Sequence, residues 1–134
     1  MTATTETVEI LPIKLSRDLI DRGGGFHVLQ ICETLGVEPA EFARLSGRST
    51  ESVAKLFRKE SVQPRSEQTR AALREMTQLV TILRAMELED EAPRWMHTPL
   101  PGFAGKTPLE LIEEGRGQEL VSRLIANATG NVGS

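Results

Sequence analysis

The chain has 134 residues and a formal net charge of −3, which comes from 16 basic and 19 acidic residues. This length suits one domain or two very small ones, and an apolar content of 39% is sufficient for a core. The single cysteine, Cys32, excludes an internal disulfide and favours a reducing compartment. The sequence has no signal-peptide pattern and no apolar run near the ~20 residues that span a membrane. We therefore expect a cytoplasmic protein with no membrane contact.

Residues 1–25 are predicted to form an N-terminal arm that is partly flexible. Apolar residues from Val8 to Leu15 surround Pro12, and a proline argues against a central strand. We expect an extended arm that docks on the domain or pairs with another subunit. Ser16 can cap a short helix that ends at residues 23–25, three glycines in a row. These glycines lack the strand–loop–helix setting of a phosphate-binding loop, so a flexible joint is predicted.

Residues 26–65 are predicted to form a helical region with a sharp corner. A first helix runs from Phe26 to Leu35 and ends at Gly36. The stretch from Pro39 to Arg58 then predicts a helix, a tight turn and a second helix. Glycine tolerates a positive φ at the turn, where Gly47 lies, and the side chain after it can cap the second helix. The cap is Ser49, and the buried stripe of the second helix is Val53, Leu56 and Phe57.

The spacing around this corner resembles the helix-turn-helix of phage-repressor-like (Xre-type) DNA-binding proteins. That family places Ala, Gly, a β-branched residue and Leu at the positions of Ala43, Gly47, Val53 and Leu56. The alternative is a packing corner with no ligand, which is common in all-α proteins.

Local charge favours contact with nucleic acid. The segment from Arg44 to Arg74 has eight basic residues against three acidic ones, a basic island in an acidic chain. The alternative is a solvated cationic face. On the DNA-binding interpretation, a single helix-turn-helix covers little DNA, so a homodimer on a two-fold operator is expected. The expected contacts to base edges or phosphates are Arg48, Ser49, Thr50, Ser52 and Lys55, and the expected phosphate contacts are Arg58, Lys59 and Arg65.

Residues 66–92 are predicted to form a long connecting helix. Pro64 breaks the preceding helix, Ser66 starts the new one, and an amphipathic pattern continues to about Leu88. The apolar stripe can serve as core, as a dimer seam, or as both. The acidic cluster that ends it, residues 87–91, is interpreted as a solvated helix end and not as a metal site.

Residues 93–134 open with a loop from Trp95 to Gly105, punctuated by proline and glycine, that carries large apolar side chains. These must be buried, either in the domain's own core or against another protein. Thr107 and Glu110 predict a capping box, with a proline between them at the first helical position. That short helix ends at residue 114, and a last amphipathic helix begins near Gln118.

The order of these features resembles the toxin-binding domain of the Xre/MbcA/ParS antitoxin family. With the helix-turn-helix, the resemblance covers roughly Phe26 to Gly130. It implies an all-α fold, with an Xre-like helix-turn-helix bundle followed by a small helical toxin-binding domain and a C-terminal tail. One departure is Glu38, which stands where a Ser or Thr cap is expected. The residues that carry the resemblance are Trp95, Pro99, Leu100, Gly105, Thr107, Pro108, Leu111, Ile112, Gly115, Val121 and Leu124.

The resemblance also implies a function. Such antitoxins bind and block a RES-type toxin that consumes NAD, perform no chemistry themselves, and need no cofactor or metal. The sequence agrees, since no catalytic set can be assembled from it. In the family the final residues enter the toxin's pocket, which here are 126–134; the alternative is a frayed terminus. The toxin-binding residues implied are Trp95, Leu100, Phe103, Ile112, Arg123, Asn127, Thr129, Gly130 and Asn131.

Two further hypotheses compete with an antitoxin that also represses its own operon. One is a stand-alone Xre-type transcriptional regulator whose C-terminal domain dimerises. The other is a small enzyme, which would need a catalytic group that the sequence does not reveal.

Overall fold

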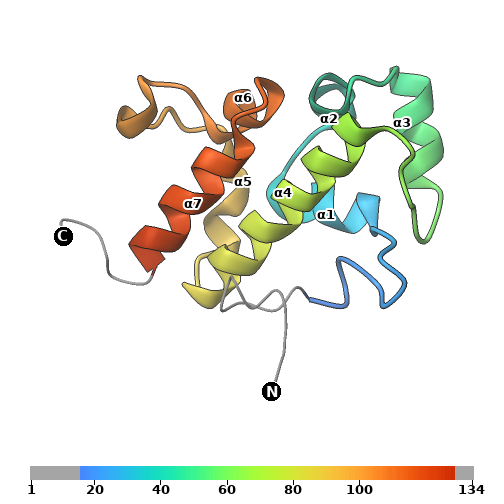
Figure 1. Cartoon of the computed structure of the whole chain (residues 1–134), viewed down its shortest axis with the longest axis horizontal. Coiled ribbons are helices and arrows are strands. Elements are labelled where there is room, and N and C mark those ends of the chain that lie inside the picture. The colour runs from blue at the N-terminus through green and yellow to red at the C-terminus, as the bar shows by residue number, and fades with distance from the viewer. Residues whose placement is uncertain (1–15, 129–134) are drawn as a thin grey trace.

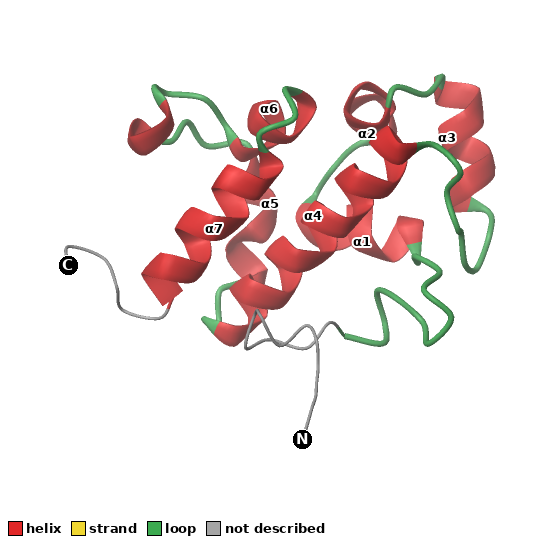
Figure 2. Ribbon diagram, in the orientation of Figure 1, coloured by secondary structure: helices red, strands yellow, loops and turns green. Residues whose placement is uncertain are grey.

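The computed structural model describes residues 16–128 of the chain, and this part is all-α, as predicted (Figure 2). Isolated bridges, such as the one between Phe26 and Val62, are the only β pairing among the described residues. The predicted arm up to residue 15 and the tail from residue 129 lie outside this part. The helices are α1 (Val28–Leu35), α2 (Pro39–Ser46), α3 (Thr50–Phe57), α4 (Glu67–Ala85), α5 (Ala92–Met96), α6 (Pro108–Glu113) and α7 (Gly117–Ala128), with 3-10 turns η1 (Glu89–Glu91) and η2 (Pro101–Phe103).

The long helix α4 passes through the middle of the molecule. Figure 1 shows α1, α2 and α3 on one side of it and α5, α6 and α7 on the other. Its contacts are with α1 and α2 on one side and with α6 and α7 on the other. Leu73, Met76 and Leu79 have no exposed surface. The apolar stripe that sequence left open as core or dimer seam is therefore buried in the chain's own core.

Polar residues on α4 are buried without loss of hydrogen bonds. The Thr77 hydroxyl donates to the Leu73 carbonyl at 2.7 Å, and the Thr81 hydroxyl donates to the Thr77 carbonyl at 2.9 Å. A buried hydroxyl with no partner would destabilise the fold, and these bonds to the preceding turn remove that cost. Other helices can therefore pack on several faces of α4. The buried apolar residues form one core cluster that extends from Leu19 to Leu124. The domain boundaries predicted within this continuous core stay a prediction.

The helix ends follow the chemistry predicted from sequence. Gly36 and Gly47 end α1 and α2 in the left-handed region, with φ of 67° and 71°. Ser49 accepts a hydrogen bond from the Ser52 amide at 3.1 Å at the start of α3. Thr107 and Glu110 exchange two bonds of 2.9 and 3.1 Å, which confirms the predicted capping box. These terminal groups would otherwise lack partners, so each cap fixes where a helix begins or ends.

Glu38, the departure from the family pattern, is accommodated by its neighbour in α2. The Glu41 carboxylate accepts a hydrogen bond from the Glu38 amide at 2.8 Å, which satisfies a donor at the helix start. A carboxylate near the N-terminus of a helix is also favoured by the helix dipole, so a Ser or Thr is not needed here.

The structure corrects the prediction for residues 16–25. Ser16 starts a turn and not a helix, with the amides of residues 19 and 20 both bonded to its carbonyl. The glycine run is not a free joint, because the Asp21 carboxylate accepts from the amides of Gly23 and Gly25. The Ser61 hydroxyl donates to the same carboxylate at 2.6 Å. Sequence could not show this, since the partner lies 40 residues away.

Two further corrections concern the segment after α4. The predicted helix to about Leu88 ends at Ala85, and Arg84 binds Asp18 and Glu89 at 2.8–3.2 Å there. Trp95 lies on the short helix α5 and not on a loop. Proline is tolerated in a first helical turn, where its missing N–H is not needed, so Pro93 fits into the first turn of α5, directly after Ala92.

Candidate partner-binding surfaces

The predicted helix-turn-helix is present as α2, the turn at Gly47 and α3. A Cβ at Gly47 would lie 2.6 Å from the side-chain oxygen of Gln68, a flexible end that can shift, so the positive φ of 71° is the main reason for glycine at this turn. The Thr69 hydroxyl of α4 donates to the Ser46 carbonyl at 3.3 Å. The corner is thus anchored on the central helix. Val53 and Leu56, which are 0% and 5% exposed, bury the inner face of α3.

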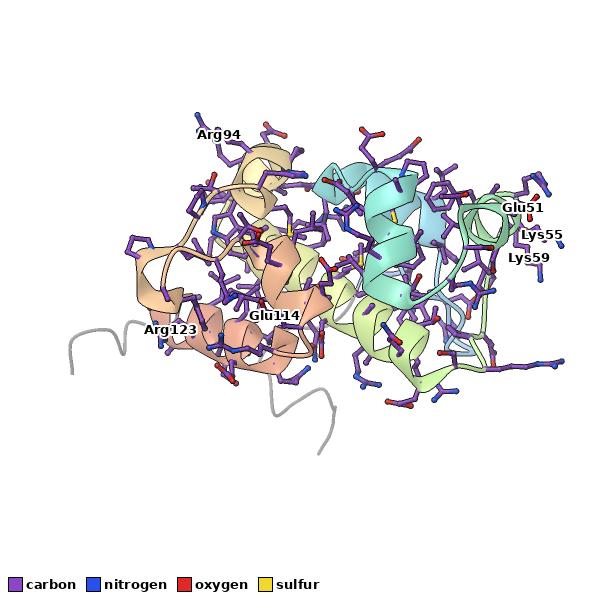
Figure 3. All side chains as sticks on the ribbon, turned by 90° about the horizontal axis from the view of Figure 1, so that it is seen from above. Glu51, Lys55, Lys59, Arg94, Glu114 and Arg123 are labelled. Carbon is purple, nitrogen blue, oxygen red and sulfur yellow. The ribbon has the colours of Figure 1, made fainter. Side chains whose placement is uncertain are left out.

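The outer face of α3 is open to solvent and carries unpaired positive charge. Ser49, Thr50 and Lys55 are exposed, whereas Ser52 is half-buried. Lys55 and Lys59 lie at one end of the molecule, opposite Arg94 and Arg123 (Figure 3). Five of the predicted DNA-contacting residues are cations without an ion-pair partner within residues 16–128, namely Arg48, Lys55, Arg58, Lys59 and Arg65.

The structure has fewer unpaired cations in this region than the sequence suggested. Arg44 lies 3.9 Å from Glu113 of α6, and Arg70 and Arg74 both approach Glu67, at 2.6 and 3.6 Å. These three arginines are therefore partly neutralised within the chain. Four of the five remaining cations lie on α3 and the segment that follows it. The fifth, Arg48, lies half-buried at the turn before α3, with its Nε buried and unbonded in the described structure.

At the other end of the molecule, α5, η2 and α7 enclose a small cleft of about 180 Å³. The cleft brings together five of the residues predicted to bind a toxin, although they are up to 32 positions apart in the chain. Its walls are mainly apolar, and Arg123 and Asn127 supply polar groups. The lining residues are Trp95, Leu100, Pro101, Gly102, Phe103, Leu120, Arg123, Leu124 and Asn127.

Phe103 holds two arginines beside this cleft. The Arg123 guanidinium lies 4.8 Å from the ring centroid and that of Arg116 lies 5.7 Å from it, which are cation–π distances. Arg116 also binds Glu119 at 3.0 Å, and this hydrogen bond lowers the pKa of the Glu119 carboxyl. Phe103 is only 6% exposed, so the ring serves as a fixed support.

The remaining predicted toxin-binding residues stand apart from the cleft. Ile112 is 4% exposed and packs in the core, so it offers little surface to a partner. Thr129, Gly130 and Asn131 lie outside the described residues. Sequence reasoning missed Pro101, Gly102, Leu120 and Leu124 as cleft residues. The Pro-Gly-Phe run was a visible signal for the first two, whereas nothing in the sequence showed which face of α7 meets η2.

Within residues 16–128 no group of three or more His, Cys, Asp or Glu side chains is placed to hold a metal ion. No helix in that range is long and apolar enough to cross a bilayer. Cys32 is 1% exposed, and burial raises the pKa of its thiol to about 12, which makes it a poor nucleophile.

Comparison with known proteins gives two matches. Residues 78–128 match the family model of the antitoxin Xre/MbcA/ParS C-terminal toxin-binding domain. A chain in the crystal structure of the M. tuberculosis MbcT-MbcA toxin-antitoxin complex superimposes with a TM-score of 0.61 and 26% identity, covering 78% of this chain and 92% of that chain. The chain thus contains a region that matches this toxin-binding domain family, and most of the chain is similar in fold to one member of an antitoxin complex. No curated protein sequence matches it.

The Xre/MbcA/ParS match begins within α4 and extends to the end of α7. It includes every residue that lines the cleft, whereas α2 and α3 precede it. The region matched to this family is thus larger than the predicted segment from residue 93, because it takes in the end of the central helix against which α7 packs.

Proposed function

We propose that this chain is the antitoxin of a type II toxin–antitoxin pair. It binds and blocks a RES-type toxin that consumes NAD, and it represses its own operon by binding DNA. The observation that carries the first part is the cleft between α5, η2 and α7, where five residues implied by the family resemblance lie together inside the matched domain. The similar M. tuberculosis structure is that of a toxin-antitoxin complex, which supports the same assignment.

According to this proposal, the antitoxin blocks the toxin by binding to it and catalyses no reaction. The cleft contains one cation, an amide and apolar side chains, which suit recognition of a protein surface. Residues 129–134 follow α7 directly, and we propose that they enter the NAD pocket of the toxin. A free thiol at Cys32 suits a reducing cytoplasm as the place of action.

The test is co-expression with the RES-type toxin encoded beside the gene. The full chain should co-purify with the toxin and abolish NAD consumption in a fluorescence assay. A variant that ends at Ala128 keeps α7 complete, so it should still bind the toxin. Because it lacks the residues proposed to block the NAD pocket, the bound toxin should still consume NAD. Absence of any complex with the full chain would refute the proposal, and full inhibition by the truncated chain would refute the role of the tail.

The second part of the proposal rests on the exposed face of α3. Its unpaired cations surround a helix whose inner face is buried, which is the arrangement that lets a second helix lie in the major groove. In a gel shift with the DNA upstream of the gene, Lys55→Ala and Arg58→Ala should each weaken binding. Each change should also lower the slope of log affinity against log salt by about 1.

Arg94→Ala is the matched control for DNA binding, since Arg94 is exposed but lies at the opposite end of the molecule (Figure 3). Equal affinities of the wild type and both α3 variants would contradict this part. We also propose a homodimer on a two-fold operator. The apolar stripe of α4 is buried within one chain, so the dimer seam must use another surface.

A further inference from the structure

One cation in the C-terminal half of the described chain stands out because it forms no direct ion pair there, although, after the hydrogen bond from Arg116, its charge also helps to lower the pKa of the Glu119 carboxyl. From Glu67 to Ala128 there are seven Lys and Arg residues, and six of them form ion pairs within the chain. The exception is Arg123 on α7. The nearby Glu119 carboxylate is bound to Arg116.

The guanidinium of Arg123 is nevertheless held in place. It lies 4.8 Å from the centroid of the buried Phe103 ring, which stacks on one of its faces. On the side of η2, its Nη1 atom lies 2.8 Å from the point that a Cβ at Gly102 would occupy. A side chain at this position would press on the end of Arg123, so Gly102 gives the guanidinium room to lie here. An arginine supported by a ring and by backbone loses less entropy when it forms a hydrogen bond.

The surroundings of this guanidinium define what it can bind. Trp95, Leu100 and Leu124 form apolar walls of the same cleft, and Asn127 adds an amide one turn along α7. Guanidinium N–H groups bind a carboxylate through two parallel hydrogen bonds, and this pairing strengthens where water is excluded. The cleft volume of about 180 Å³ suits one or two side chains and not a cofactor.

We propose that this cleft is a receptor for an acidic side chain of the toxin, with Arg123 as the group that pairs with its carboxylate and an adjacent apolar toxin residue against Trp95. This inference rests on the proposed function and adds the chemistry of the contact. It assigns to the toxin an Asp or Glu beside an apolar residue at the centre of the interface. Charge complementarity is the reason, since a cation covered by a partner must be paired.

The experiment measures the affinity of the purified full chain for its RES-type toxin by calorimetry. Arg123→Ala should weaken binding by about 30-fold, the effect of leaving a buried partner charge unpaired. Arg123→Lys keeps the charge but loses the paired geometry, so its affinity should lie between those of the wild type and Arg123→Ala. Arg94→Ala is the control, because Arg94 is exposed and paired with Glu91 outside the cleft, and its affinity should equal that of the wild type.

A second variant tests the position of the guanidinium without a change of charge. Gly102→Ala places a methyl group 2.8 Å from Nη1, and the flexible arginine end can move away without disturbing the core. The urea midpoint should stay at the wild-type value while toxin affinity falls. An Arg123→Glu chain should regain binding to a toxin in which one acidic residue has been changed to Lys.

Each outcome decides the proposal. A wild-type chain that does not bind the toxin overturns both this inference and the proposed function. Toxin binding that is unchanged in Arg123→Ala overturns this inference alone. It is also overturned if the loss in Arg123→Ala disappears when the chain ends at Ala128, because Arg123 would then be holding residues 129–134 and not the toxin.

Discussion

Replacing Gly36 by Ala should destabilise the chain more than replacing a glycine with the same backbone conformation elsewhere. Gly36 ends α1 with a φ of 67°, a region that costs a residue with a Cβ about 1–2 kcal/mol. A Cβ there would also lie 2.6 Å from the Cβ of Pro93 and 3.0 Å from its Cα. The second atom belongs to the backbone of α5 and the first to a rigid ring, so neither can move alone.

The steric part of this cost adds about 1–3 kcal/mol, as for other overpacked sites, and the total is about 2–5 kcal/mol. Gly105 provides the control. Its φ is 80°, and a Cβ there would have no atom within 4 Å. Gly105→Ala should therefore lose only the conformational part, about 1–2 kcal/mol.

Urea unfolding followed by circular dichroism measures both variants. The midpoint of Gly36→Ala should fall further than that of Gly105→Ala, with an unchanged dependence of free energy on urea, because the surface exposed on unfolding stays the same. Equal losses in the two variants would refute the claim that α1 and α5 are in tight contact at Gly36.

Three further predictions concern single side chains. Hydrogen bonding of His97 to the Pro93 carbonyl and to Glu41 raises its pKa, so protonated His97 stabilises the fold below about pH 6.5, and this stabilisation is lost as the pH rises through the folded-state pKa. Between about pH 6 and about pH 8.5 the urea midpoint should fall more in the wild type than in His97→Gln. Arg84→Met should lower the free energy of unfolding by about 2 kcal/mol in the same assay, because its carboxylate partners lose charge-assisted hydrogen bonds. The Cys32 thiol should react with iodoacetamide at pH 8 only after unfolding in urea, and rapid labelling of the native chain would contradict its burial.

Local chemistry explains which parts of the fold could be predicted from sequence. Gly47, Ser49 and the Thr107 capping box act over three or four residues, so their effect is visible in the order of residues alone. The turn after Ser16 and the fixed glycine run depend on Asp21 and on residue 61, which are brought together only by the fold. Long-range hydrogen bonds of this kind leave no periodic signal.

In the candidate site, too, some features could be predicted from the sequence and others depend on the fold. Trp95, Phe103 and Arg123 were expected from the family resemblance, and the structure brings them to one cleft. The role of each residue in the cleft depends on how deeply its side chain is buried. Phe103 is buried and supports a guanidinium, whereas Ile112, another residue that the resemblance implied, lies in the core. Helical periodicity gives the face on which a residue lies, and burial depends on which neighbouring helix covers that face.

Because both groups of helices pack on α4, the two halves of the chain should be degraded together in a cell. The helices at both ends of the molecule cover the same central helix, so neither end retains a complete core when the other is removed. A protease that cuts α7 away would uncover the face of α4 against which α7 packs. A ligand that binds only the folded chain protects all of it by mass action. A ligand in the C-terminal cleft would thus lengthen the lifetime of the α3 surface, and degradation would remove both proposed binding surfaces in a single event.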